Sequence, residues 1–363
     1  MTRVLIDGRP LYDGHSRDRG IGVFLRSLLD RLAPMSDLSL AALVMPGTEL
    51  PAGVRPVAIR RLDQHRMERF EHALRLSLEI PRAKPDVFHS PALEPPFRTG
   101  KPWVQTLHDV TPLVYDDPFF ANEAARWKRL FGRMRRASAV VADSRYSAEM
   151  AVKIAGIDPA KVHVVLIGVD PAFSALERTA ADPPYVLYVG VYGPHKGYAE
   201  AIRVADLLAE RGFPHRLKVV GTLNPWREEQ IRPLLARAAH PERVELLGFV
   251  DRDELRRLYA GATALIMTSR VEGFGLPVVE AMAAGTPVVS FRNTALTEVV
   301  SGGGELVDDG DAEAMAVAVA ALIEDAAKWR ESSERGRGHA RAFDWNTTAA
   351  AYAEIYRTVA RGG

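Results

Sequence analysis

The sequence contains no cysteine and no run of 18 uninterrupted apolar residues. The first absence excludes thiol catalysis, disulfide bonds and cysteine-based zinc or iron–sulfur sites. The second argues against a transmembrane helix. The formal net charge is only +1, which is too weak a bias to indicate nucleic-acid binding. Because the chain opens with a strand-like segment instead of a signal peptide, we expect a cytoplasmic protein.

Short apolar runs recur along the 363 residues, with helical stretches between them. A chain of this length exceeds what one hydrophobic core usually serves, so two domains are expected. The runs are rich in Val, Ile and Leu without polar alternation, which is typical of parallel strands covered on both faces. They read RVLID, LAALVM, VRPVAI, DVFHS, WVQTLHD and AVVADS in the first half, and YVLYVG, RLKVVG, VELLGF, TALIMTS and PVVSF in the second. We therefore predict an α/β fold of two doubly wound, Rossmann-like domains.

The domain boundaries follow from composition. Residues 171–184 lack clear periodicity and end in a proline pair, so we expect a linker there. It would separate a first domain, residues 1–170, from a second domain, residues 185–345, with a C-terminal helix over 346–363. Amphipathic patterns predict helices near 311–325 and 346–360. Ligands should bind in the cleft between the carboxyl ends of the two sets of strands.

One stretch, SRVEGFGLPVVEAMAAGTPVVS at residues 269–290, places two glutamates around a glycine turn. TALIMTS predicts a strand before it, and PVVEAMAAG predicts a short helix with Pro277 at its first position and Gly285 at its C-terminal cap. Glu272 then lies on the loop at the carboxyl end of a strand. Glu280 lies in the first turn of the following helix.

The amides of Phe274, Gly275 and Leu276 precede this helix, and a helix N-terminus favours anions, phosphate above all. The pattern alone therefore indicates a nucleotide-sugar pocket, with ribose at Glu280, diphosphate at the amides and hexose at Glu272. A purely structural alternative makes one glutamate a partner of the helix dipole and leaves the other solvated. The glycines, the proline and the flanking strands in register argue against it.

The stretch EGFGLPVVEAMAAGTPVV resembles the signature of the retaining glycosyltransferases of family 4. The resemblance spans nearly the entire chain, through DGRPLYDGHSRDRGIGVFLRSLL, VFHSP, TLHDVTPLVY, VADSRYS, GVDPAF, VGVYGPHKG, VVGT, LLGFVDRDELRRLYAGATALIMTS and FDWNTTAAAYAEIY. It implies a GT-B fold of two facing Rossmann-like domains, with the donor on the second domain and acceptor contacts on the first. It also implies that the closing helix returns to the first domain.

Two residues would carry the chemistry together with Glu272. Lys196, in GPHKG, matches the family lysine that contacts the donor diphosphate, and the chain holds only eight lysines against 39 arginines. The family commonly has an arginine where this sequence has Val191, so one diphosphate contact is absent or comes from elsewhere, with His195 as a candidate. His108 matches a family histidine that faces the transferred sugar. A structural role for this strand-end histidine is the alternative.

Acceptor contacts are expected from the first domain. Asp109 lies beside His108 at a strand end, and His89, in FHSP, is a weaker candidate. The acceptor itself is not readable from the sequence, because loops such as that expected at residues 60–85 vary freely among enzymes of one fold.

Glycines and strand-end residues should line the donor pocket. Gly20 and Gly22, in RGIGVF, are expected to let the first loop approach the donor phosphates. This is not the dinucleotide fingerprint, because Leu25 stands in place of the third glycine, so an NAD site is disfavoured.

The base of the nucleotide should lie near two further strand ends. Gly221 is expected to clear space for the nucleotide, and Phe249 and Val250 should border the base. Ordinary strand-end packing is the alternative for all of these positions.

The resemblance implies transfer with retention at the anomeric carbon, without a metal or other cofactor; the nucleotide sugar is a co-substrate. The leaving phosphate itself would receive the acceptor proton, so catalysis would consist of positioning and charge stabilisation. The sequence resembles members that act on GDP-mannose or related sugars, and a UDP-sugar is the alternative donor. A disaccharide phosphorylase or sugar-nucleotide epimerase of the same fold, and a non-catalytic sugar-nucleotide binder, are competing interpretations.

The stretch RWKRLFGRMRR carries six positive charges and no acid. The charges are those of Arg126, Lys128, Arg129, Arg133, Arg135 and Arg136. Such a helix could lie on an anionic membrane to reach a lipid-linked acceptor, at the inner face of the membrane. A surface helix with a solvated face is the plainer interpretation.

Overall fold

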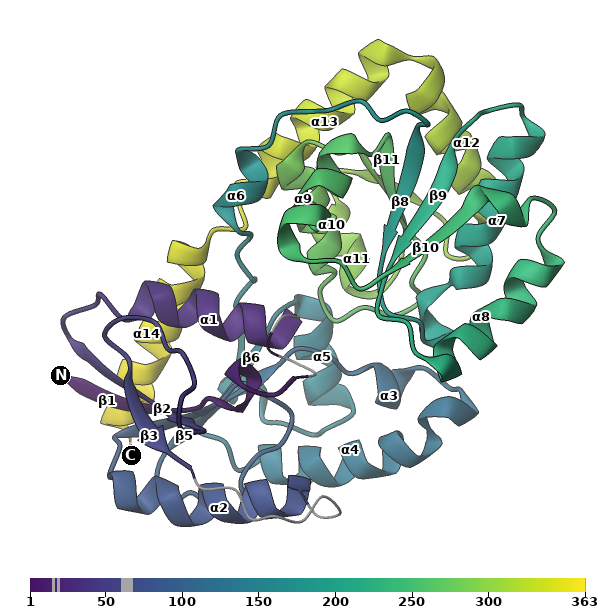
Figure 1. The fold of residues 1–363 in the computed structure, drawn as a ribbon. Helices are drawn as coiled ribbons and strands as arrows, with labels where there is room; N and C mark the ends of the chain where they lie inside the picture. Colours follow the sequence, from purple (N-terminus) through teal and green to yellow (C-terminus); the bar gives the residue numbers. More distant parts are fainter. Residues whose placement is uncertain (15–16, 18–19, 60–67, 363) are drawn as a thin grey trace. The chain divides into compact units, whose positions relative to one another are not determined.

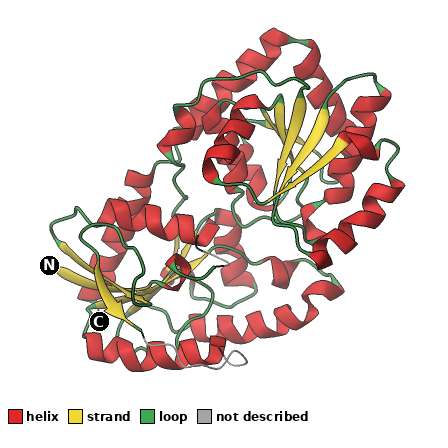
Figure 2. Cartoon of the chain, viewed as in Figure 1, coloured by secondary structure: helices red, strands yellow, loops and turns green. Residues whose placement is uncertain are grey.

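The computed structural model describes residues 1–14, 17, 20–59 and 68–362, which divide into two compact units (Figure 1). One unit combines Met1–Gly168 with Asp344–Gly363, and the other is Val169–Phe343. Each unit contains one parallel sheet, and Figure 2 shows helices on both faces of each sheet. The predicted pair of doubly wound α/β domains is confirmed. Residues 171–184 lie in the second unit and begin with the short helix α6 (Pro171–Ser174).

Within the described residues, the sheet of the first unit has seven strands in the order β3-β2-β1-β4-β5-β6-β7. They are β1 (Thr2–Asp7), β2 (Leu38–Val44), β3 (Arg55–Ala58), β4 (Val87–Ser90), β5 (Trp103–Leu107), β6 (Ala139–Ala142) and β7 (Val162–Val164). Strands β4, β5 and β6 are buried throughout, which explains why their sequences lack polar alternation. The strand order reverses between β1 and β4, so the carboxyl ends of these two strands form the switch point of the sheet.

The first unit also contains the helices between these strands and the helix that closes the chain. They are η1 (Arg9–Leu11), α1 (Gly20–Leu32), α2 (Glu68–Ala83), α3 (Thr111–Val114), η2 (Pro118–Phe120), α4 (Ala121–Met134), α5 (Arg145–Lys153), η3 (Pro159–Lys161) and the closing helix α14 (Trp345–Arg361). Within the described ranges, no helix has both the length and the apolar character needed to cross a membrane.

The closing helix α14 packs against α1 and the sheet of the first unit, as predicted. Two of its tyrosines are fully buried. A 2.8 Å hydrogen bond joins the Tyr356 hydroxyl to Nδ1 of His89, and a 2.9 Å hydrogen bond joins the Tyr352 hydroxyl to Thr106 Oγ1. These bonds satisfy polar groups that would otherwise be buried without partners, so they fix the helix on β4 and β5.

The sheet of the second unit has six strands in the order β10-β9-β8-β11-β12-β13. They are β8 (Tyr185–Val189), β9 (Arg216–Val220), β10 (Val244–Gly248), β11 (Ala264–Met267), β12 (Val288–Phe291) and β13 (Glu305–Val307). The helices are η4 (Pro194–Lys196), α7 (Tyr198–Glu210), α8 (Pro225–Arg237), η5 (Pro241–Arg243), α9 (Arg252–Gly261), α10 (Leu276–Ala284), α11 (Thr294–Val300), α12 (Ala312–Glu324) and α13 (Ala326–Ala340). Here the order reverses between β8 and β11.

The structure adds elements that the sequence patterns did not predict. Strands β7 and β13 are three residues long, lie at sheet edges and are not buried. The prediction of a loop at residues 60–85 was wrong for most of its length, because residues 68–83 form helix α2. Residues 60–67 of that stretch lie outside the described residues.

Replacing Tyr356 by phenylalanine should lower the free energy of unfolding by about 1–3 kcal/mol, because a ring nitrogen of fully buried His89 loses its partner. Urea denaturation measures the change. Glu354→Gln on the exposed side of the same helix is the control, and its surface ion pairs should contribute less than about 1 kcal/mol. Equal stability of Tyr356→Phe and the unaltered chain would show that the hydrogen bond does not hold α14 in place.

Candidate active site

In the second unit, the carboxyl ends of β8 and β11 meet at the switch point of the sheet, where open α/β sheets bind their ligands. Lys196 ends the short helix η4 after β8, and Glu272 lies on the loop after β11. Their side chains form an ion pair with 2.6 Å between Nζ and Oε1. The two residues were predicted separately from the sequence, and the fold brings them into contact.

Backbone contacts hold the lysine in this position. The Tyr188 hydroxyl donates a 2.8 Å hydrogen bond to the carbonyl oxygen of Lys196, and the Thr268 hydroxyl donates one of 2.7 Å to that of Gly197. Gly197 has a φ of 62°, and a Cβ atom there would lie 2.0 Å from the Thr268 carbonyl oxygen. Only glycine fits this position, because both the backbone conformation and the space exclude a side chain.

The ion pair keeps Glu272 ionised. Burial would raise the pKa of this carboxyl, but the charge and hydrogen bond of Lys196 outweigh burial and lower it. His195 behaves differently: burial, assisted by the Lys196 charge, lowers its pKa to about 4. The imidazole is therefore neutral at pH 7. As the predicted substitute for the arginine missing at Val191, it offers a hydrogen bond but no positive charge.

The loop after Glu272 leads into helix α10. Gly275 is the N-cap residue of this helix, with a φ of 96°, and it has no side chain that could cap the helix by a hydrogen bond. The first turn contains no acidic residue, and Pro277 has no N–H group. Phe274 is buried in edge-to-face contact with Phe343. The helix N-terminus therefore carries an uncompensated partial positive charge next to the ion pair, which suits an anionic ligand.

Glu280 lies deeper than predicted. It is the fifth residue of α10, because the helix begins at Leu276, and it is 5% exposed. The Tyr259 hydroxyl donates a 3.0 Å hydrogen bond to its Oε2, and Nη1 of Arg252 lies 3.9 Å from its Oε1. Burial raises the pKa of Glu280 to about 7, so the carboxyl can accept or donate hydrogen bonds near neutral pH.

The remaining donor-side residues of the second unit lie at neighbouring strand ends. Gly221 follows β9, and a Cβ atom there would lie 2.3 Å from the carbonyl oxygen of Gly190. The glycine is therefore required by the close approach of two backbone segments, a different reason from the predicted space for a nucleotide. Phe249 and Val250 follow β10, and Phe249 is 56% exposed.

In the first unit, His108 follows β5 with both ring nitrogens engaged. Nδ1 lies 2.5 Å from Oδ2 of Asp143, and Nε2 lies 3.0 Å from the carbonyl oxygen of Pro91. Burial would lower the pKa of His108, but the Asp143 carboxylate outweighs it and raises the pKa. Asp143 was not predicted. It follows β6, the strand next to β5, and polar residues at neighbouring strand ends were the signal that could have found it.

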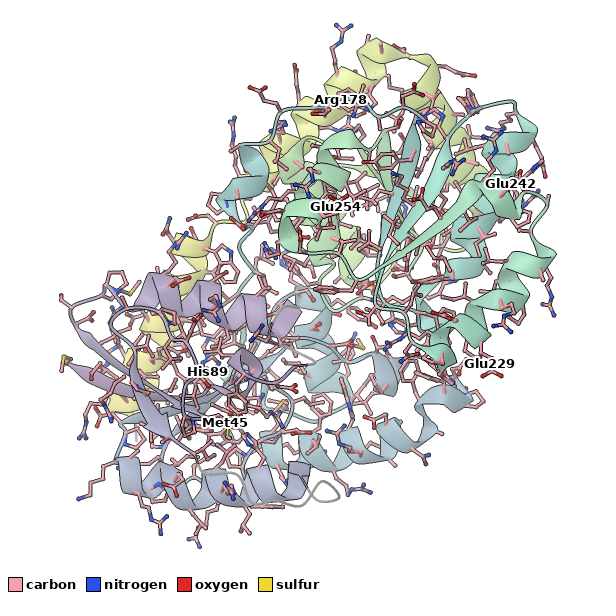
Figure 3. The ribbon with its side chains drawn as sticks, in the orientation of Figure 1. Met45, His89, Arg178, Glu229, Glu242 and Glu254 are labelled. Atoms are coloured by element: carbon pink, nitrogen blue, oxygen red, sulfur yellow. The ribbon has the colours of Figure 1, made fainter. Side chains whose placement is uncertain are left out.

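His89, Asp109 and the two glycines at positions 20 and 22 are the remaining residues predicted for the first unit. His89, labelled in Figure 3, is fully buried, and both its ring nitrogens bond to protein hydroxyls, so it is not exposed to an acceptor. Burial lowers its pKa to about 3, which keeps it neutral. Oδ1 of Asp109 accepts three hydrogen bonds, from the amide and the hydroxyl of Thr111 and from the amide of Val110. These bonds order the start of α3.

Gly20 and Gly22 belong to the first turn of α1, not to the loop before it. Among the described residues, a Cβ atom on Gly20 would meet no other atom within 4 Å. Close packing does not therefore explain the glycine at this position.

The six basic residues of the predicted stretch lie on α4 and directly after it: Arg126, Lys128, Arg129, Arg133, Arg135 and Arg136. Arg126 pairs with two carboxylates. The Arg133 guanidinium lies 4.0 Å from the centroid of the Phe97 ring. Lys128 and Arg129 are exposed. The stretch therefore combines residues tied to the protein surface with others that face solvent.

The contact between Lys196 and Glu272 can be tested by a double-mutant cycle with Lys196→Met and Glu272→Gln. Their side chains are only 19% and 15% exposed, so each single variant leaves a mostly buried group without its partner. Each should lower the free energy of unfolding by about 1–3 kcal/mol, and the double variant by less than their sum. Additive losses in urea denaturation would contradict the contact.

Residues 19–173 match the model of glycosyltransferase family 4, and residues 172–339 match that of the group 1 glycosyl transferases. The sequence is 30% identical to the O-antigen chain mannosyltransferase B of Escherichia coli over 174 residues, which are 48% of this chain and 45% of that protein. The chain thus spans less than half the length of this relative.

Two solved structures share the fold. A sucrose-phosphate synthase from Thermosynechococcus elongatus has a TM-score of 0.79 at 21% identity, with 100% of both chains covered. The Anabaena protein HepE, in complex with UDP and glucose, has a TM-score of 0.74 at 20% identity, with 99% of this chain and 100% of HepE covered. With the two family models together running from residue 19 to residue 339, the chain belongs to the group 1 glycosyltransferases of family 4 and has the GT-B fold.

Proposed function

We propose that this protein is a retaining, metal-independent glycosyltransferase that moves a hexose from a nucleotide-diphosphate sugar to an acceptor. One observation carries the proposal: the ion pair of Lys196 and Glu272 lies beside the glycine-capped N-terminus of α10, at the switch point of the second sheet. A lysine and free helix amides favour a diphosphate, and the paired carboxylate can accept hydrogen bonds from sugar hydroxyls. Family membership supports the same activity.

The proposed roles follow the geometry of the second unit. The amides of Phe274, Gly275 and Leu276 bind the diphosphate, and Lys196 stabilises the charge that builds up on it as the glycosidic bond breaks. Glu272 orients the hexose. Glu280 holds the ribose.

The base of the nucleotide lies at the carboxyl ends of β9 and β10. Phe249 and Val250 border it, and Gly221 keeps the adjoining loops close together. The exposed face of Phe249 is suited to stack on a base, since aromatic rings pack well against each other in offset geometry.

The proposed chemistry is a front-face attack with retention. The acceptor oxygen bonds to the anomeric carbon as the bond to the leaving phosphate breaks, and the acceptor proton passes to that phosphate. No side chain has to act as a general base, which agrees with Glu272 being engaged by Lys196. Positioning and charge stabilisation would then supply the rate acceleration.

His108 is the proposed contribution of the first unit. Its ring is fixed by Asp143 and the Pro91 carbonyl oxygen, and its raised pKa favours the imidazolium. A hydrogen bond to the transferred sugar would have to replace one of these contacts. We propose that the positive charge of this group favours the transition state, in which negative charge moves to the leaving phosphate.

The donor is either a UDP-hexose or GDP-mannose. The solved complex of HepE contains UDP and glucose, whereas the Escherichia coli relative is named a mannosyltransferase. The acceptor is proposed to belong to polysaccharide, glycolipid or natural-product assembly. A phosphorylase or epimerase of the same fold would instead release sugar 1-phosphate with phosphate, or convert the nucleotide sugar without an acceptor.

Contact with an anionic membrane surface, on the cytoplasmic side, stays a prediction. Lys128, Arg129, Arg135 and Arg136 are exposed charges of the basic stretch that such a surface would meet.

A thermal-shift panel of UDP, GDP, ADP and dTDP, each with its sugar conjugates, should identify the donor. A ligand bound only by the folded chain adds about 2.7 kcal/mol of stability at a hundred times its dissociation constant. One nucleoside diphosphate should raise the melting temperature well above the other three. No shift with any of them would contradict a donor site of this type.

Transfer should depend on Glu272 and His108 for different reasons. With the donor identified, Glu272→Ala should abolish hydrolysis or transfer while nucleoside diphosphate binding persists. His108→Ala should lower kcat by at least about tenfold with unchanged nucleotide affinity, because His108 belongs to the other unit. Glu298→Ala, on helix α11, is the control and should retain activity. If both site variants transfer sugar at the rate of the control, these roles are wrong.

A chain that binds the nucleotide but neither hydrolyses nor transfers any donor would favour the non-catalytic alternative. In that case Val191 is the first position to change. Val191→Arg restores the residue common in the family, and a gain of activity would trace the loss to this position.

A further inference from the structure

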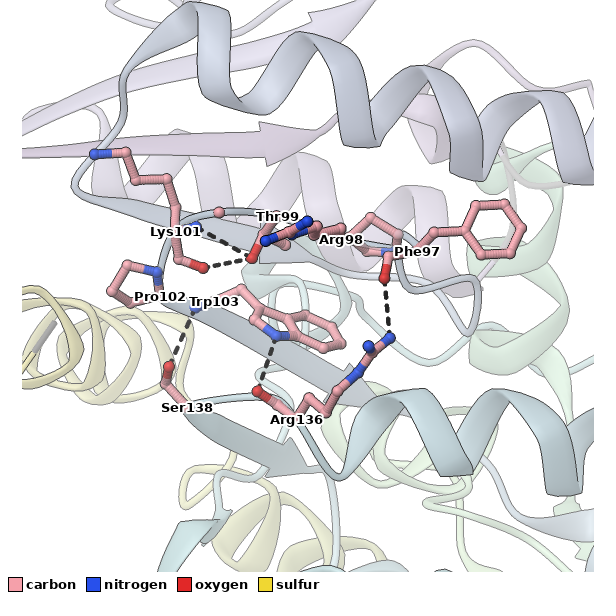
Figure 4. Close-up of a pocket in the computed structure, with 10 residues that line it drawn as sticks. Phe97, Arg98, Thr99, Lys101, Pro102, Trp103, Arg136 and Ser138 are labelled. Atoms are coloured by element: carbon pink, nitrogen blue, oxygen red, sulfur yellow. Dashed lines mark hydrogen bonds between the residues drawn. The ribbon is translucent and has the colours of Figure 1, made fainter.

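A cavity of about 350 Å³ opens at the amino-terminal edge of the sheet of the first unit (Figure 4). It is lined by the loop of residues 96–102, by Trp103 at the start of β5, and by Arg136 and Ser138 after α4. Apart from Arg136, which belongs to the basic stretch, none of these residues has a role in the function proposed above. The volume lies in the range of small-molecule sites.

The lining is cationic. It includes Arg98, Lys101 and Arg136 and no carboxylate. Figure 4 shows the Arg98 and Arg136 side chains near Trp103, whereas Lys101 extends away from it. The Arg136 guanidinium donates a 2.9 Å hydrogen bond to the Phe97 carbonyl oxygen, a neutral partner. Within the described part of the chain, the Arg98 guanidinium has no hydrogen bond or ion pair. Two guanidinium charges therefore remain uncompensated here.

The walls of the cavity are held by hydrogen bonds. The Trp103 indole donates to the carbonyl oxygen of Arg136 at 3.2 Å, and its amide donates to Oγ of Ser138 at 3.4 Å. The amide of Arg98 donates to Oγ of Ser77, which fixes the loop on α2. These bonds order the walls of the cavity.

The local electrostatic potential is positive. Arg133 packs on Phe97 beside the cavity, and its pKa is lowered by burial and then by the charges of Arg136 and Arg129. A group whose charged form is disfavoured by neighbouring cations marks a region that attracts anions.

We propose that this cavity is a second anion site, which binds a phosphate group through Arg98 and Arg136. Guanidinium groups recognise phosphate by paired, charge-assisted hydrogen bonds, and Trp103 supplies an apolar wall for the remainder of the ligand. The phosphate can belong to a soluble ester or to a phospholipid head group. Strand β5 separates the cavity from His108 by five residues, or roughly 16 Å, so the site is distinct from the proposed transfer site.

Isothermal titration with inorganic pyrophosphate tests the site on the full chain at low ionic strength. Saturating UDP, and GDP in a parallel series, occupies the proposed donor site. Arg98→Ala removes a guanidinium that holds no other part of the protein, so folding should be preserved and a thermal melt verifies it. The exposed arginine of β3 provides the control, Arg55→Ala.

Pyrophosphate should bind the unaltered chain and Arg55→Ala alike, and Arg98→Ala at least about tenfold more weakly. Arg98→Lys should bind with intermediate affinity. Because the readout is binding at Arg98, it does not depend on whether the chain transfers sugar.

Vesicles of phosphatidylcholine with and without phosphatidylglycerol form the second arm. Sedimentation with the anionic vesicles that is lost in Arg98→Ala but kept in Arg55→Ala would identify the phosphate as a lipid head group. Pyrophosphate binding without vesicle binding would identify a soluble ester. If Arg98→Ala matches the unaltered chain in both arms, or if the unaltered chain binds neither probe, the proposed site does not exist.

Discussion

Lys196 and Glu272 lie in segments that follow different strands, and the 2.6 Å contact between their side chains requires those segments to be held close together. Contacts to the backbone hold them there. Gly197 approaches the Thr268 carbonyl so closely that no side chain fits between them, and the Tyr188 hydroxyl fixes the carbonyl of the lysine. The carboxylate and the ammonium are thus positioned where β8 and β11 meet, and the start of α10 is the proposed anion site.

The two glutamates of the conspicuous stretch occupy opposite electrostatic environments. Lysine keeps the pKa of Glu272 low, whereas burial raises that of Glu280 to about 7. One carboxyl is therefore a fixed negative charge, and the other can be neutral at physiological pH. In the proposed function this division suits their ligands. The charged carboxylate of Glu272 accepts hydrogen bonds from hexose hydroxyls and orients them. The partly protonated carboxyl of Glu280 can hold a ribose near the negatively charged diphosphate with less repulsion.

Sequence patterns predicted the two α/β domains, because buried parallel strands read as continuous apolar runs, and they failed at β7 and β13, which are short edge strands that bury little. Glycine, proline and glutamate spacing located the candidate site. Contacts across the fold could not be predicted in this way: the pairing of Lys196 with Glu272 and the partnership of His108 with Asp143 depend on strand order. Resemblance to the family gave no warning that both nitrogens of His89 are engaged inside the protein.

The central claim is that Lys196 and the start of α10 bind the diphosphate of the donor. Titration of a nucleoside diphosphate and the matching nucleoside monophosphate into the unaltered chain and Lys196→Ala tests it most directly. Our account predicts that the unaltered chain prefers the diphosphate and that most of this preference disappears in the variant, with the monophosphate affinity nearly unchanged. An equal preference for the diphosphate in both proteins would contradict it.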